Sequence, residues 1–107
     1  MRRTPVRLMA MVVLTLAAGQ GEAQEIGQPG RGLVAAQRLC AQCHAVQKGQ
    51  TRSPNGNAPR FQTIASVPGM TAIALSAALN TSHRSMPNIM LERDEQADII
   101  AYILSLK

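Results

Sequence analysis

The sequence predicts an all-α domain with three main helices and long loops, and three observations predict it. The chain has no strand-rich pattern, because apolar and polar residues do not alternate in the runs typical of half-buried strands. Its last segment, residues 93–106, has apolar residues at helical spacing. Glycine and proline break the chain within residues 48–57, at residues 68–69 and at residue 87. Since such long loops are unusual in a small domain, we expect them to wrap a ligand.

The first part of the domain predicts one helix followed by a polar loop. Residues 24–32 contain glycine and proline, so we expect this stretch to fray. The first helix runs from Leu33 to about Ala45, a stretch rich in good helix formers, with both cysteines at its C-terminal end. Residues 48–57 form a loop, and residues 58–61 lead from it toward the core.

A turn, a short helix and a second loop are expected next. Pro68–Gly69 marks the turn, and Thr71 is the expected N-cap of a short helix that ends near Leu79. Residues 80–88 return to a loop, which Pro87 breaks.

The C-terminal helix is the clearest of the three and is expected over residues 93–106. Apolar side chains recur there at positions i, i+3, i+4 and i+7, namely at Ala97, Ile100, Ala101 and Leu104. Asp94 and Glu95 fall in the first turn and Lys107 follows the end, a distribution of charge that suits the helix dipole.

The first 23 residues predict a secretory signal peptide. Three arginines begin it, an apolar run extends to Ala18, and small residues precede an expected cleavage site after Ala23. The apolar run is shorter than the ~20 residues of a membrane span, which disfavours the alternative of a retained anchor. We therefore expect one mature domain, residues 24–107, in the periplasm and without stable insertion in the membrane after cleavage.

The composition of residues 24–107 indicates a small domain that needs help to fill its core. These residues include eight lysines and arginines and five aspartates and glutamates, so their formal net charge is +3. This charge is too small for a protein that binds nucleic acid. Phe61 and Tyr102 are the only aromatic residues. A domain of this size buries a modest share of its surface, so a covalently held ligand would supply the missing apolar mass.

Cys40-Ala41-Gln42-Cys43-His44 reads C-x-x-C-H, the attachment motif for one covalent c-type haem. Two thiols three positions apart can add to the two vinyl groups of one porphyrin, and the next residue, His44, then lies under the iron. A thioredoxin-like pair would need a βαβ setting, and a zinc site would need four Cys or His ligands. A disulfide between Cys40 and Cys43 would close a loop too short to stabilise much.

A six-coordinate haem also needs a distal ligand, and Met70, His83, Met86 and Met90 are the downstream candidates. We expect Met70 and Met90 to pack in the core and His83 to face solvent. Met86 lies in an irregular loop that can be shaped around a ligand, and Pro87 fixes the chain direction after it. Met86 is therefore the favoured metal ligand opposite His44.

The domain resembles the small soluble class I cytochromes c of bacteria. Several segments carry this resemblance: Gly32, Cys40–His44, Ala58–Phe61, Ser85–Pro87 and Leu91–Leu106. It implies the cytochrome c fold, with long loops wrapped around one covalent haem, and a small residue at position 32 where the first and last helices cross. It also implies that the backbone carbonyl of Pro59 accepts a hydrogen bond from the ring of His44. This bond would orient the imidazole that binds the iron.

These features favour a periplasmic carrier of single electrons rather than an enzyme, because both axial positions of the iron would be filled. Its partners would be redox proteins, one donor and one acceptor, bound transiently. Two alternatives stay open at this stage. The chain could be the haem-bearing subunit of a larger periplasmic dehydrogenase or oxidase, or a sensor or enzyme whose distal position is open.

Overall fold

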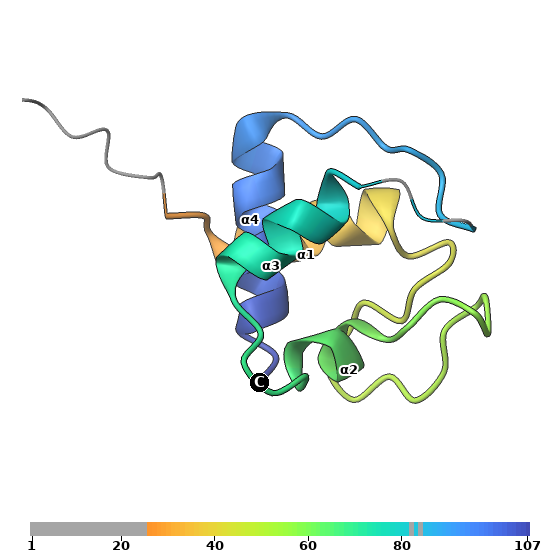
Figure 1. Cartoon of the computed structure of the whole chain (residues 1–107). Coiled ribbons are helices and arrows are strands. Elements are labelled where there is room, and N and C mark those ends of the chain that lie inside the picture. The colour runs from red at the N-terminus through yellow and green to blue at the C-terminus, as the bar shows by residue number, and fades with distance from the viewer. Residues whose placement is uncertain (1–25, 82, 84) are drawn as a thin grey trace, which may run out of the picture.

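Four α-helices, and no strand, are found in the part of the chain that the computed structural model describes, residues 26–81, 83 and 85–107. They are α1 (Pro29–Leu39), α2 (Phe61–Ala65), α3 (Ala72–Leu79) and α4 (Arg93–Leu104). Long connections join them and enclose one side of the molecule (Figure 1). The all-α prediction is confirmed. The expected signal peptide and the expected start of the mature chain at Gln24 lie outside the described residues.

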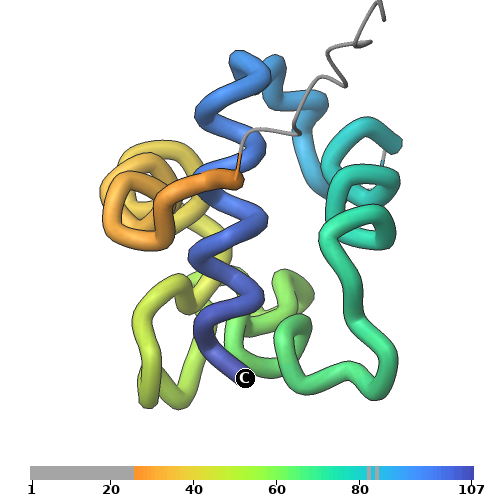
Figure 2. Tube along the Cα trace, turned by 90° about the vertical axis from the view of Figure 1, so that its left-hand side faces the viewer, coloured from red at the N-terminus to blue at the C-terminus, as the bar shows by residue number. Residues whose placement is uncertain are grey.

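The packing of α1 across α4 organises the fold, and Gly32 makes it possible (Figure 2). A Cβ atom on Gly32 would lie 1.9 Å from the carbonyl oxygen of Asp98 and 2.7 Å from Cβ of Tyr102. Gly27, just before α1, has the same property, because its Cβ would lie 1.9 Å from the carbonyl oxygen of Ala97. Two glycines therefore let backbone meet backbone, and Ala36, which is fully buried, continues the contact one turn later.

The carboxylate of Asp98, near the middle of α4, binds the start of α1. Its Oδ1 accepts hydrogen bonds from the backbone N–H of Gln28 (2.7 Å) and from Nη2 of Arg31 (3.1 Å), and Oδ2 accepts from Nε of Arg31 (2.8 Å). Asp98 is buried, and these donors hold the pKa of its carboxyl below the ordinary value of 3.8. A side chain on α4 thus satisfies a backbone donor at the N-terminus of α1.

Helix α3 begins where the sequence predicts and is tied to α4 by polar side chains. The hydroxyl of Thr71 accepts a hydrogen bond from the backbone N–H of Ala74 at 3.1 Å, so the expected N-cap is confirmed. The side-chain amide of Gln96 on α4 donates to the hydroxyl of Ser76 (3.0 Å). Leu75 is the one side chain of α3 that is buried among the described residues, and it faces the core.

The first helix lies further toward the N-terminus than predicted. It begins at Pro29 rather than Leu33, since proline suits the first helical position and Asp98 binds the backbone of the preceding residue. It ends at Leu39 rather than near Ala45, and both cysteines follow in the turn over residues 40–43. Propensity alone could show neither limit, because a tertiary contact sets the start of the helix and the fold of the next segment sets its end.

The sequence pattern did not predict α2, whereas the expected C-terminal helix is present as α4. Helix α2 has only five residues, too few for a helical period to be visible, and it follows the burial of Phe61. On α4 the most buried apolar side chains are Ile99, Ile103 and Tyr102. Three of the four residues whose spacing predicted the helix, Ala97, Ala101 and Leu104, are only half-buried. The core surrounds the helix more widely than one stripe suggests.

A methyl group at position 32 should separate α1 from α4. We expect Gly32→Ala to lower the free energy of unfolding by about 3 kcal/mol, the upper end of the cost of overpacking. Gly30→Ala is the matched control, because nothing lies within 4 Å of its added Cβ. In the same helix it should leave stability unchanged or raise it by up to about 1 kcal/mol. Urea unfolding of the holoprotein measures both, and an equal loss in the two variants would contradict the close crossing.

The contribution of Asp98 should depend on pH in one direction. Because the folded pKa is lowered, the stabilisation is present above the ordinary pKa of 3.8 and is lost as the pH falls through the folded pKa. Asp98→Asn should therefore cost about 2 kcal/mol at pH 7, and the difference from the wild type should shrink below about pH 4. Asp94→Asn, an exposed carboxylate on the same helix, should cost under about 1 kcal/mol. A difference for Asp98→Asn that stays constant with pH would contradict the assignment.

Candidate functional site

An apolar cavity of about 350 Å³ brings together residues from every part of the described chain. Its volume falls in the ~300–1,000 Å³ range of sites for small molecules and cofactors. The segment after α1 supplies Cys40, Cys43 and His44, and the segment before α2 supplies Pro59 and Phe61. The remaining walls come from α2, α3, the loop between α3 and α4, and α4, with Ile64, Leu75, Leu79, His83, Met86, Ile89 and Ile103 among them. None of its lining residues is a lysine, arginine, aspartate or glutamate among those that the structure describes.

The two cysteines reach this cavity because the chain turns sharply at the end of α1. The backbone N–H groups of Cys43 and His44 both donate to the carbonyl oxygen of Cys40, at 3.1 and 2.9 Å. Both thiols are unpaired. Burial, followed by the negative charge of Glu95, raises the pKa of Cys40 to about 11. A thioredoxin-like pair works through a lowered thiol pKa, so this environment argues against that alternative.

The ring of His44 is held from one side by the backbone. Its Nδ1 lies 2.6 Å from the carbonyl oxygen of Pro59. A carbonyl can only accept, so Nδ1 is the protonated nitrogen and the lone pair is on Nε2. The ring of Phe61 lies beside that of His44, with centroids 5.4 Å apart and planes tilted by 52°. His44 therefore has one fixed tautomer and one ring nitrogen available to a metal.

Hydrogen bonds from three directions fix the loop that carries Pro59. The backbone N–H of Asn55 donates to the carbonyl oxygen of Cys43 (3.1 Å), and that of Phe61 donates to the carbonyl oxygen of Ala45 (2.9 Å). From α4, the hydroxyl of Tyr102 donates to the carbonyl oxygen of Val46 at 2.5 Å. Burial raises the pKa of Tyr102, so the phenol keeps its proton and this hydrogen bond at neutral pH.

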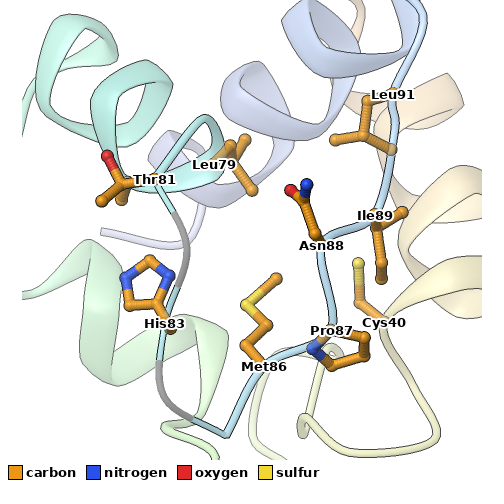
Figure 3. Close-up of a pocket in the computed structure, with 10 residues that line it drawn as sticks. Cys40, Leu79, Thr81, His83, Met86, Pro87, Asn88, Ile89 and Leu91 are labelled. Atoms are coloured by element: carbon orange, nitrogen blue, oxygen red, sulfur yellow. The ribbon is translucent and has the colours of Figure 1, made fainter.

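The loop between α3 and α4 also supplies side chains to the cavity that His44 lines. Met86 is half-buried, and its side chain points into the pocket beside Leu79 and Cys40 (Figure 3). His83 is exposed, as expected, yet it also lines the cavity. Of the four distal candidates, the structure places these two at the cavity.

The other two methionines lie elsewhere. Met70 is partly buried and packs against the core, in line with the expected packing role. The expectation for Met90 is wrong, because its side chain is 87% exposed. It follows Pro87 in an extended segment whose neighbours Ile89 and Leu91 are the residues that turn inward. Neither Met70 nor Met90 lines the cavity.

The cavity fits a haem by the chemistry of its walls. Two thiols three positions apart lie on one wall with an imidazole directly after them, and a thioether comes from the opposite loop. The remaining lining is mostly aliphatic and aromatic, as a porphyrin face requires. The described lining residues include no carboxylate.

Sequence reasoning missed several residues that build this site. Leu75 and Leu79 line the cavity from α3, and their spacing of four residues was the signal that could have identified them. Asp98 and Tyr102 act through partners 70 and 56 residues away, at Gln28 and Val46, so no local pattern indicates them.

Within the described residues, no helix combines the length and the apolar character needed to cross a membrane.

Comparisons with known proteins agree with this site. The family model described as Cytochrome c matches residues 28–107. The chain is 34% identical over 97 residues to the protein "Cytochrome c-552" of Bradyrhizobium diazoefficiens, an alignment that covers 90% of this chain and 92% of that relative. No solved structure shows significant similarity to the chain.

Proposed function

The chain belongs to the cytochrome c family, and from that premise we propose that it is a periplasmic carrier of single electrons with a His44- and Met86-ligated haem. The family and the relative support an electron carrier that works through haem. The observation that carries the finer proposal is the cavity itself, on which both thiols, His44 and Met86 converge.

The cofactor is one covalent haem c, held through Cys40 and Cys43. When bound, the haem supplies an iron that takes up and releases one electron at a time. The residues of the chain hold it in place and shape its surroundings. The proposed role of the Pro59 carbonyl is to keep the proton on Nδ1 of His44, which orients the ring and makes Nε2 a better donor.

Met86 is proposed as the distal ligand because it is the thioether that enters the cavity. A neutral thioether costs little to bury and favours the reduced iron, so it raises the potential relative to a second imidazole. If His44 and Met86 both bound the iron, no coordination position would be left for a substrate at the metal. This is the reason for proposing a carrier rather than an enzyme.

Transient redox proteins are the proposed partners, and they would approach at the mouth of the cavity. His83, Ser85, Pro87 and Ala78 are exposed there, and none of them carries a fixed charge. Because long-range attraction needs charge, docking at such a rim depends mainly on short contacts that form and break quickly. This suits a carrier that must release each partner after one electron.

Intact mass should show both the covalent haem and the processed N-terminus. After denaturation and extraction with acidic solvent, periplasmic protein should weigh as much as residues 24–107 plus one haem. Cys43→Ala should prevent stable maturation of the holoprotein, because one of the two thioether attachments of the haem is removed. A mass equal to the bare polypeptide would contradict covalent attachment. A haem-bearing chain that begins at Met1 would contradict only the cleavage.

Replacing the distal thioether should change the haem spectrum and the potential. We expect Met86→Ala to abolish the sulfur-to-iron charge-transfer band of the oxidised protein and to lower the reduction potential, since a thioether stabilises the reduced iron. Absorption spectroscopy and redox titration measure the two effects.

Two methionines outside the cavity provide the controls for this experiment. Met70→Leu and Met90→Leu exchange similar volumes away from the cavity, so both should keep the band and the potential. The ligand assignment would be wrong if Met86→Ala kept the band and either of these variants lost it.

A further inference from the structure

Two donors, rather than one, stand at the distal side of the cavity. Met86 and His83 both line the main cavity, and both also line a smaller adjoining pocket. The sequence holds only two histidines, and the other is His44. Both imidazoles of the sequence therefore lie at the same cavity, His44 on the segment after α1 and His83 on the loop between α3 and α4.

The backbone brings the two distal donors together. His83 and Met86 form an isolated antiparallel bridge, and the N–H of Met86 donates to the carbonyl oxygen of His83 at 3.3 Å. Residues that face each other in such a bridge have Cβ atoms about 4.5–5.5 Å apart. The two side chains thus leave the backbone from neighbouring positions. An iron that the Met86 thioether can reach is therefore also within reach of the His83 imidazole.

The two side chains differ in orientation. The Met86 side chain points into the pocket, whereas the His83 ring lies at its edge (Figure 3). The ring is exposed and has no hydrogen bond or ion pair to any described residue. No interaction with another described residue needs to break when the ring turns, and rotation of an exposed side chain takes picoseconds to nanoseconds. Met86 is thus placed to bind the iron as the structure stands, and His83 would bind it after its ring turns.

We propose that His83 is a reserve distal ligand, which binds the haem iron through its imidazole whenever the Met86 thioether does not. This inference rests on the proposed ligation by His44 and Met86. An imidazole is a stronger donor to oxidised iron than a thioether, so His83 would close the distal side and hold the iron at a lower potential. The loop would thereby prevent the carrier from becoming a site that binds small external ligands.

The test compares single and double variants of the holoprotein at neutral pH. Met86→Ala should remain six-coordinate and low-spin, because His83 takes the distal place. Met86→Ala/His83→Asn should become high-spin. It should also bind azide about tenfold more tightly or better, since apparent affinity rises with the fraction of molecules whose distal position is free. Electron paramagnetic resonance and azide titration give the two readouts.

A matched control separates ligation by His83 from disturbance of the loop. Asn88 is exposed and lines the smaller pocket, as His83 does. Met86→Ala/Asn88→Ala should therefore behave like Met86→Ala alone. His83→Asn alone should keep the sulfur-to-iron band. If the alanine at position 86 prevents maturation, Met86→Leu fills a similar volume without a strong donor and serves in the same comparison.

The outcomes distinguish this inference from the proposed function. If Met86→Ala loses the band but is high-spin, with the azide affinity of the double variant, the reserve role of His83 is overturned and Met86 remains the ligand. If Met86→Ala keeps the band, the proposed ligation fails and the inference fails with it. A low-spin single variant that becomes high-spin only when His83 is also replaced supports both.

Discussion

The contact on which the rest of the structure depends is that of the α1 backbone against the α4 backbone at Gly32. The carbonyl of Asp98 occupies the space where any side chain at position 32 would lie. The Asp98 carboxylate then binds Gln28 and Arg31, which fixes the start of α1 relative to α4. Because α1 is rigid, this crossing also determines where its far end delivers Cys40. The position of the haem attachment motif is thus a consequence of a helix contact about 12 Å away, because Gly32 precedes Cys40 by eight residues and an α-helix rises ~1.5 Å per residue.

Helix α4 also supports the side of the cavity on which His44 lies, here called the proximal side. Tyr102 lies next to the crossing and binds the carbonyl of Val46, just past the motif. Its ring faces that of Phe61, with centroids 6.5 Å apart, and Phe61 in turn contacts His44. The only two aromatic side chains of the chain therefore connect the helix crossing to the ring of the proposed proximal ligand. A domain with so few aromatic residues places both where they brace the site.

The distal side is built differently. Helix α3 is attached to α4 through Ser76 and Gln96, and in the loop that follows Met86 is paired with His83 in an isolated bridge. This pairing is the observation on which the proposed reserve role of His83 rests. Among the residues that the structure describes, those of this loop that line the cavity carry no fixed charge.

The sequence by itself determined the all-α class, the haem motif, the Thr71 cap and the start of α4 at Arg93, because each depends on residues near one another in the chain. It also singled out Met86, though its ligand role stays a proposal. Only the tertiary structure decided that α1 begins at Pro29, that Phe61 starts a fourth helix, and that Met90 faces outward. The reason is physical. These features depend on contacts between segments dozens of residues apart, such as Gln28 with Asp98 and Tyr102 with Val46, which leave no periodicity or spacing for a local pattern to reveal.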